Sequence, residues 1–150
     1  MIGADPNPAD FSSVLYAKIH VDGDTTSPTW TWSAKNTIGT DIVAYRNTSL
    51  PVNAISSAIG VDNTLELTVT PTSDDCMIVA FAAIDTSTTA RTWTIPGTMT
   101  EVAEKHSSLH RYIAQELLSG GSGIAVSRTL EFSGSEQDWD GFIVALAPSA

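Results

Sequence analysis

Short runs in which apolar and polar side chains alternate one by one constrain the fold of this chain more than any other feature. Leu65, Leu67 and Val69 alternate with threonine and glutamate, and residues 124–132 repeat the pattern with alanine, serine, threonine and glutamate between larger side chains. A period of two places every second side chain on one face of a strand, whereas a helix needs a period near 3.6. The pattern therefore predicts strands that each bury one face.

Similar runs follow one another along the chain, and turn-forming residues separate them. The predicted strands are Ser13–Val21, Thr29–Ser33, Ile42–Tyr45, a strand after Pro51, Leu65–Val69 with its flanking threonines, Cys76–Ile84, Thr92–Ile95, Ser108–Ser119, Ile124–Phe132 and Phe142–Leu146 with Trp139 before it. Ser108–Ser119 also fits a helical stripe, and we interpret it as a strand. Pro51 restricts the strand after it to a sheet edge or a strand start, because proline has no N–H to donate.

Eight or more strands without a convincing helix predict an all-β protein. The expected architecture is a single antiparallel β-sandwich that is jelly-roll-like. A chain of 150 residues suits one domain, which we place at residues 13–150. Residues 1–12 contain Pro6 and Pro8 and have no periodic pattern, so they are predicted to form an extended N-terminal arm. Cys76–Ile84 is predicted to be the most buried strand, and the run that ends at Leu146 is expected in a sheet centre.

The balance of charge limits the partners of the chain. The formal net charge is −10 and the isoelectric point is near 4.4, so phosphate backbones and anionic lipids repel the molecule. No apolar run approaches the roughly 18 residues of a membrane-spanning helix, and the first residues lack the pattern of a secretion signal. We expect no nucleic-acid or membrane partner and synthesis in a cytoplasm. Cys76, the single cysteine, is expected to be inert in a covered strand.

No motif in the sequence specifies a reaction, so we predict no enzyme, no catalytic residue, no cofactor and no metal site. Gly121-Ser122-Gly123 lacks the spacing of a hydrolase nucleophile elbow. His106 and His110 would share one face of a helix, as metal-binding histidines do at that spacing. The predicted strand separates them, so we interpret both, together with His20, as surface histidines.

Acidic pairs and tryptophans offer two alternatives to a purely structural interpretation. The pairs Asp22/Asp24, Asp74/Asp75 and Asp138/Asp140 could supply calcium ligands, but aspartates in turns more often cap the backbone. Trp30 and Trp32 share one strand face and could stack against sugar rings, although burial in the core is favoured. Trp93 and Trp139 are predicted to be core residues at strand ends.

The order of several short signatures resembles β-sandwich modules in tailed-phage virion proteins and related bacterial open reading frames. The matching pieces are Thr29-Trp30-Thr31-Trp32, Ile42-Val43-Ala44-Tyr45-Arg46-Asn47, Met77-Ile78-Val79-Ala80-Phe81, Thr92-Trp93-Thr94-Ile95-Pro96-Gly97 with Met99-Thr100-Glu101, and Trp139 through Val144-Ala145-Leu146-Ala147-Pro148. They span almost the whole chain after the arm. The group usually has glycine after the arginine of the second piece, where this chain has Asn47.

The resemblance implies a phage virion structural protein. The leading interpretation is a capsid decoration (cement) protein on the outer shell. The alternative is a tail-associated adhesion or carbohydrate-binding module that recognises host surface glycans through Trp30 and Trp32. For a decoration protein, the expected partner is the major capsid protein of the same virion, the expected location is the capsid surface, and the expected oligomer is a homo-trimer. The predicted contacts of the arm are Ile2, Asp5, Pro6, Pro8 and Phe11. Weak contacts that repeat over a lattice would sum to firm attachment.

Overall fold

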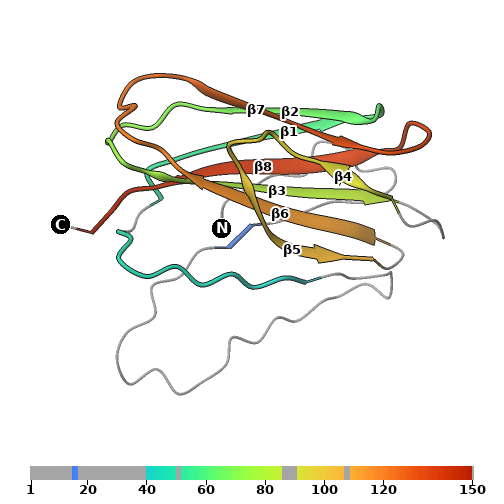
Figure 1. Cartoon of the computed structure of the whole chain (residues 1–150), viewed down its shortest axis with the longest axis horizontal. Coiled ribbons are helices and arrows are strands. Elements are labelled where there is room, and N and C mark those ends of the chain that lie inside the picture. Colours follow the sequence, from blue (N-terminus) through green and yellow to red (C-terminus); the bar gives the residue numbers. More distant parts are fainter. Residues whose placement is uncertain (1–14, 17–39, 50–51, 86–90, 107–108, 150) are drawn as a thin grey trace, which may run out of the picture.

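The computed structural model describes residues 15–16, 40–49, 52–85, 91–106 and 109–149. These residues form eight strands and no helix, and the strands make two antiparallel sheets packed against each other (Figure 1). The strands are β1 (Ala54–Gly60), β2 (Thr64–Val69), β3 (Met77–Asp85), β4 (Trp93–Thr94), β5 (Thr100–Lys105), β6 (Leu109–Leu117), β7 (Val126–Phe132) and β8 (Trp139–Leu146). The predicted all-β sandwich is confirmed. Within these residues, no helix has the length and apolar character needed to cross a bilayer.

The larger sheet has the strand order β1-β8-β3-β6-β5, and the smaller sheet has the order β2-β7-β4. The pairs between distant strands are nested: β1 pairs with β8, β2 with β7, and β3 with β6. The first three strands of the chain therefore pair, in reverse order, with the last three. The jelly-roll form of this path and the N-terminal arm stay predictions.

The hydrophobic core lies between the two sheets, and the period-two pattern places it there. Leu65, Leu67 and Val69 on β2 are at most 3% exposed, as the alternation predicts. Leu130 and Phe132 of β7 are buried beside them. Burial of such side chains contributes roughly 1.5–3 kcal/mol each, so this layer holds the sheets together.

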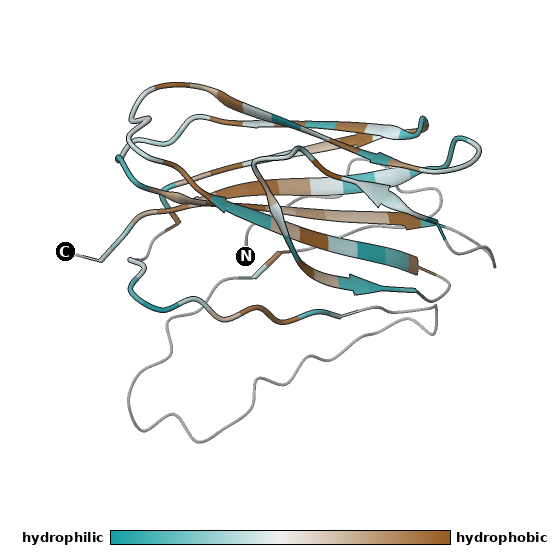
Figure 2. Cartoon of the chain, in the orientation of Figure 1, coloured by the Kyte–Doolittle hydropathy of each residue, from teal (hydrophilic) through white to brown (hydrophobic). Residues whose placement is uncertain are grey.

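Both faces of the central strands are buried. Ile78 and Ile143 belong to the core between the sheets, whereas the alternate residues Val79, Phe142 and Val144 face the other side of the sheet and are 1–4% exposed. Figure 2 shows the hydrophobic colour along much of β3 and β8. The central position of the C-terminal run is confirmed, because β8 lies between β1 and β3. The prediction that Cys76–Ile84 is the most buried strand is wrong: β3 is largely buried, but β8 is buried over more of its length.

Residues 40–49 lie along the outer side of the larger sheet but form no strand. The prediction of a covered strand at Ile42–Tyr45 is wrong, because Ile42 is 70% exposed and only Tyr45 is fixed by a side-chain bond, which its hydroxyl donates to Gln115 at 2.8 Å. A short apolar run shows that its side chains are hydrophobic. It does not show whether a neighbouring strand is free to form backbone hydrogen bonds with it. Arg111 forms an ion pair with Asp41 in the same region.

Other boundaries differ in informative ways. β1 begins shortly after Pro51 and forms an edge of the larger sheet, as the missing proline donor predicts. β5 was not predicted, because its side chains do not alternate and its pairing with β6 shifts register between Glu101 and Ala103. The predicted strand Thr29–Ser33, most of Ser13–Val21 and the arm at residues 1–12 lie outside the described residues.

Gly60 is the last residue of β1 and has no room for a side chain, because a tryptophan occupies the space above it. A Cβ added at Gly60 would lie 2.6 Å from indole atoms of Trp139. Trp139 itself is 6% exposed and its indole N–H donates to the Asp62 carboxylate at 2.9 Å. The indole therefore fixes the β1–β2 turn against β8.

We expect Gly60→Ala to lower the free energy of unfolding by about 1–3 kcal/mol, because the methyl group overpacks the Trp139 ring. Gly97→Ala is the matched control, since a Cβ there meets nothing within 4 Å. Urea unfolding followed by tryptophan fluorescence measures both variants. Equal stability of the two variants would contradict the close packing of Gly60 and Trp139.

Candidate metal centre

Three potential metal ligands meet where β5 ends and β6 begins. Glu104 lies in β5, His106 follows that strand, and His110 is the second residue of β6. The Glu104 Oε1 atom lies 3.2 Å from His106 Nε2 and 2.8 Å from His110 Nε2. One donor atom from each of the three side chains lies within 4.8 Å of the others.

This arrangement corrects the expectation that His110 is a surface histidine separate from His106, whereas the His106 side chain is 46% exposed, as expected of a surface residue. Their ring centroids are 3.8 Å apart, and His110 is 1% exposed. The strand prediction for β6 was right, but two successive antiparallel strands bring residues on either side of their connection together. The sequence argument considered the spacing of the two histidines within one element only.

The inward position of His110 follows from the alternation along β6. His110, Tyr112 and Glu116 share the face toward the smaller sheet and are all buried, while Arg111 and Gln115 lie on the other face. Three polar residues of β6 therefore face the interior, which the apolar positions Leu109, Ile113 and Leu117 on the opposite face did not reveal.

Trp93 of β4 closes the inner side of the cluster. Its ring stacks on Tyr112 at 5.2 Å between centroids and meets His110 edge-on at 5.6 Å. Its indole N–H donates to His110 Nε2 at 3.1 Å. Trp93 is 8% exposed, which confirms the prediction that it is a core residue.

Electrostatics keep the His110 imidazole neutral. Burial is the largest effect and lowers its pKa below the usual value, and the neighbouring His106 and Arg111 act in the same direction. The hydrogen bond and charge of Glu104 act in the opposite direction without overcoming burial. The neutral form of His110 keeps a lone pair available for a metal ion.

Two further polar contacts extend along the inner face of β6. The Tyr112 hydroxyl donates to the Glu101 carboxylate at 3.2 Å, and Arg128 of β7 forms an ion pair with the buried Glu116. Burial and the nearby Glu101 charge raise the pKa of Tyr112 to about 12. This side of the sandwich is thus held by paired polar groups where the apolar core ends.

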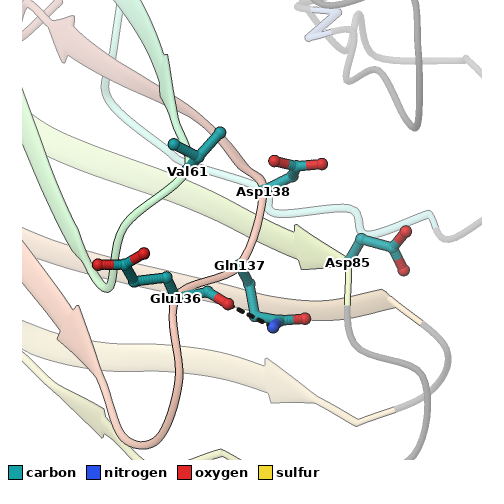
Figure 3. Close-up of a pocket in the computed structure, with 5 residues that line it drawn as sticks. All are labelled: Val61, Asp85, Glu136, Gln137 and Asp138. Atoms are coloured by element: carbon teal, nitrogen blue, oxygen red, sulfur yellow. Dashed lines mark hydrogen bonds between the residues drawn. The ribbon is translucent and has the colours of Figure 1, made fainter.

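A hollow lies at the same end of the larger sheet, where β3 ends and β8 begins, and acidic residues line it. Its volume is about 470 Å³, and Val61, Asp85, Glu136, Gln137 and Asp138 surround it (Figure 3). The Gln137 amide donates to the backbone carbonyl of Glu136, and the Asp85 N–H donates to the carbonyl of Asp138. The hollow is open and polar, and its backbone contacts join the end of β3 to the segment before β8.

The acidic pairs that the structure describes differ in their surroundings. Asp74 accepts the backbone N–H of Ser122 and Asp75 accepts that of Gly120, both at 2.8 Å. This supports the interpretation of Asp74 and Asp75 as turn residues that cap backbone. Asp140 lies within β8 and is 5% exposed, so the interpretation of this residue as a surface turn residue is wrong. Asp22/Asp24 lie outside the described residues.

The other residues singled out in the sequence have simple outcomes. Cys76 is fully buried just before β3, and burial raises the pKa of its thiol, which fits the inert role expected of it. The predicted arm contacts and the possible sugar platform all lie outside the described residues: Ile2, Asp5, Pro6, Pro8, Phe11, Trp30 and Trp32.

No family model, curated protein or solved structure matches this chain. The resemblance to tailed-phage virion modules therefore stays a prediction.

We expect the contribution of Tyr112 to the free energy of unfolding to be constant below about pH 10 and to fall as the pH rises toward 12, because the folded state retains the Tyr112 proton that the unfolded chain has lost. Glu101→Gln removes a nearby negative charge, so Tyr112 should ionise at a lower pH than in the unmodified protein. Absorbance at 295 nm during an alkaline titration measures this, with Glu131→Gln on β7 as a control of equal charge. A titration identical in both variants would contradict the coupling of Tyr112 to Glu101.

Proposed function

We propose that this chain is a non-enzymatic virion structural protein that decorates the outer surface of a phage capsid and stabilises the shell. Its partner is the major capsid protein of the same virion, and it acts as a homo-trimer that is made in the host cytoplasm. A jelly-roll-like sandwich is the scaffold, and the arm at residues 1–12 reaches a neighbouring subunit.

The observation that carries this proposal is the nested strand pairing. The partners β1 with β8, β2 with β7, and β3 with β6 are those of an antiparallel ribbon wrapped over itself. Wrapping of this kind is how double-sheet jelly rolls are built, and viral capsid and lectin domains use that architecture. β5 departs from the nested scheme by pairing with β6 in the larger sheet instead of joining β4.

The backbone at Asn47 also supports the resemblance. Its φ is 58°, in the left-handed region that favours glycine, and asparagine is among the other residues that adopt it most readily. The phage modules usually have glycine at the corresponding position. Asn47 thus replaces glycine at a position whose conformation suits both residues.

The edge strand β1 is the attachment surface that we propose beside the arm. Ile55 and Ile59 on its outer face are 36% and 39% exposed, and Val61 just beyond it is 63% exposed. No charged residue occurs in Ala54–Gly60, although the chain carries a net charge of −10. An uncharged edge strand offers backbone groups to an added strand, and we assign that place to an extended segment of the capsid protein.

The copy number per particle separates this function from the tail-associated alternative. Mass spectrometry of purified virions should find the chain in hundreds of copies if it coats the shell. A handful of copies per particle would exclude decoration and support a tail module that binds host glycans. Light scattering coupled to size exclusion should give a trimer for the isolated protein.

We expect Ile59→Asp to weaken attachment to particles that lack the protein, because a carboxylate would be buried against the added strand. Val102→Asp is the matched control: Val102 is 37% exposed on β5, the opposite edge of the same sheet. Co-sedimentation with such particles measures binding. Equal binding by both variants would remove β1 as the attachment edge.

Deletion of Met1 to Asp10 should abolish attachment and leave the fold intact. Co-sedimentation measures the first effect, and circular dichroism with thermal unfolding measures the second. A trimmed protein that still coats particles normally would refute the role of the arm.

A further inference from the structure

We propose that Glu104, His106 and His110 bind a divalent transition-metal ion, Zn²⁺ in the first place, at the junction of β5 and β6. The ligand atoms are Glu104 Oε1 and the Nε2 atoms of the two histidines. This site is separate from the attachment surfaces of the proposed function, and the two can be tested independently.

The distances between the donor atoms suit such an ion. Zinc bonds to histidine nitrogen and carboxylate oxygen are about 2.0–2.2 Å long, which places the ligands of a tetrahedral site about 3.4 Å apart. Glu104 Oε1 already lies 3.2 Å from one imidazole nitrogen and 2.8 Å from the other. Small adjustments of side chains on neighbouring strands would complete the geometry.

The hydrogen bonding of His110 gives a second, independent reason. If Nε2 accepts the indole N–H of Trp93, it has no proton for Glu104, and Nδ1 carries a buried N–H without a partner among the described residues. If Nε2 instead donates to Glu104, the indole N–H faces another N–H. Neither neutral form satisfies all three groups, and an unsatisfied buried donor or acceptor costs about 1–3 kcal/mol.

A cation relieves one of these contacts, because it binds both the Glu104 carboxylate and the His110 Nε2 lone pair that faces it. The proton of His110 then stays on Nδ1. The ion supplies the positive charge that the Glu104 carboxylate would otherwise need from a proton shared with each histidine. Coordination through His110 Nε2 uses the lone pair that the Trp93 N–H now shares, so the indole must reorient. Binding is therefore expected to alter the fluorescence of Trp93.

The surroundings distinguish the inner and outer sides of the site. His110 is fully enclosed and sits on a strand, while the His106 side chain is 46% exposed. An ion can thus arrive from the solvent side and keep a water molecule in the fourth position. The net charge of −10 draws cations to the molecule as a whole. Nitrogen ligands favour zinc, nickel or copper over calcium and magnesium.

Isothermal titration of the full chain with Zn²⁺ tests the proposal. We expect one saturable site per chain and a higher melting temperature with the metal. His106→Ala and Glu104→Gln should each weaken Zn²⁺ binding at least about tenfold, because even outer-shell partners change affinity by 10–100-fold. His106 is exposed enough for its replacement to leave the fold intact, which circular dichroism verifies.

Glu131→Gln is the control of equal charge, since Glu131 is exposed on β7, and it should bind Zn²⁺ like the unmodified chain. Co²⁺ gives a spectroscopic readout: a tetrahedral site with nitrogen ligands produces intense visible absorption, and the ion should quench Trp93. Absence of saturable binding, equal affinity in all variants, or a weak octahedral Co²⁺ spectrum would each overturn the proposal. None of these results depends on attachment to a virion.

Discussion

Burial on both faces of β3 and β8 is the constraint on which the rest of the structure depends. A strand covered on one side can carry polar groups on the other, but Ile78, Val79, Ile143 and Val144 leave neither side free. With a single cysteine, the chain has no disulfide, so this packing holds the larger sheet. The polar side chains that interact with one another therefore lie on β5, on β6 and at the strand ends, at the margin of the apolar core.

This distribution of polar side chains is clearest in the β5–β6 region. β4 consists of Trp93 and Thr94 only, so this strand covers β6 through one indole. The inward-facing polar side chains of β6, those of His110, Tyr112 and Glu116, lie at the margin of the core, where each needs a partner to offset its desolvation. Glu101, Glu104 and Arg128 serve Tyr112, His110 and Glu116 in this way. The candidate metal centre is the end of this row, where two imidazoles converge on one carboxylate.

Alternation in the sequence predicted the strands whose burial is periodic, such as β2 and β7, and the continuous apolar runs of β3 and β8. It missed β5, whose pairing is interrupted between Glu101 and Ala103, and it made Ile42–Tyr45 a strand, because hydrophobicity alone does not supply a neighbouring ladder. The cluster of Glu104 with His106 and His110 could not be found from spacing within one element. A search for ligand types on both sides of a predicted connection between antiparallel strands would have signalled it.

The central place of β8 has a consequence for biosynthesis. β1 and β3 both pair with β8, so during translation they have no common neighbour until the last of the eight strands has emerged. Contacts that distant in sequence are slow to form because a long loop must close first. The nascent chain therefore carries unpaired ladders and apolar faces through most of its synthesis. Chaperone protection on the ribosome would matter more for this chain than for a helical protein of equal length.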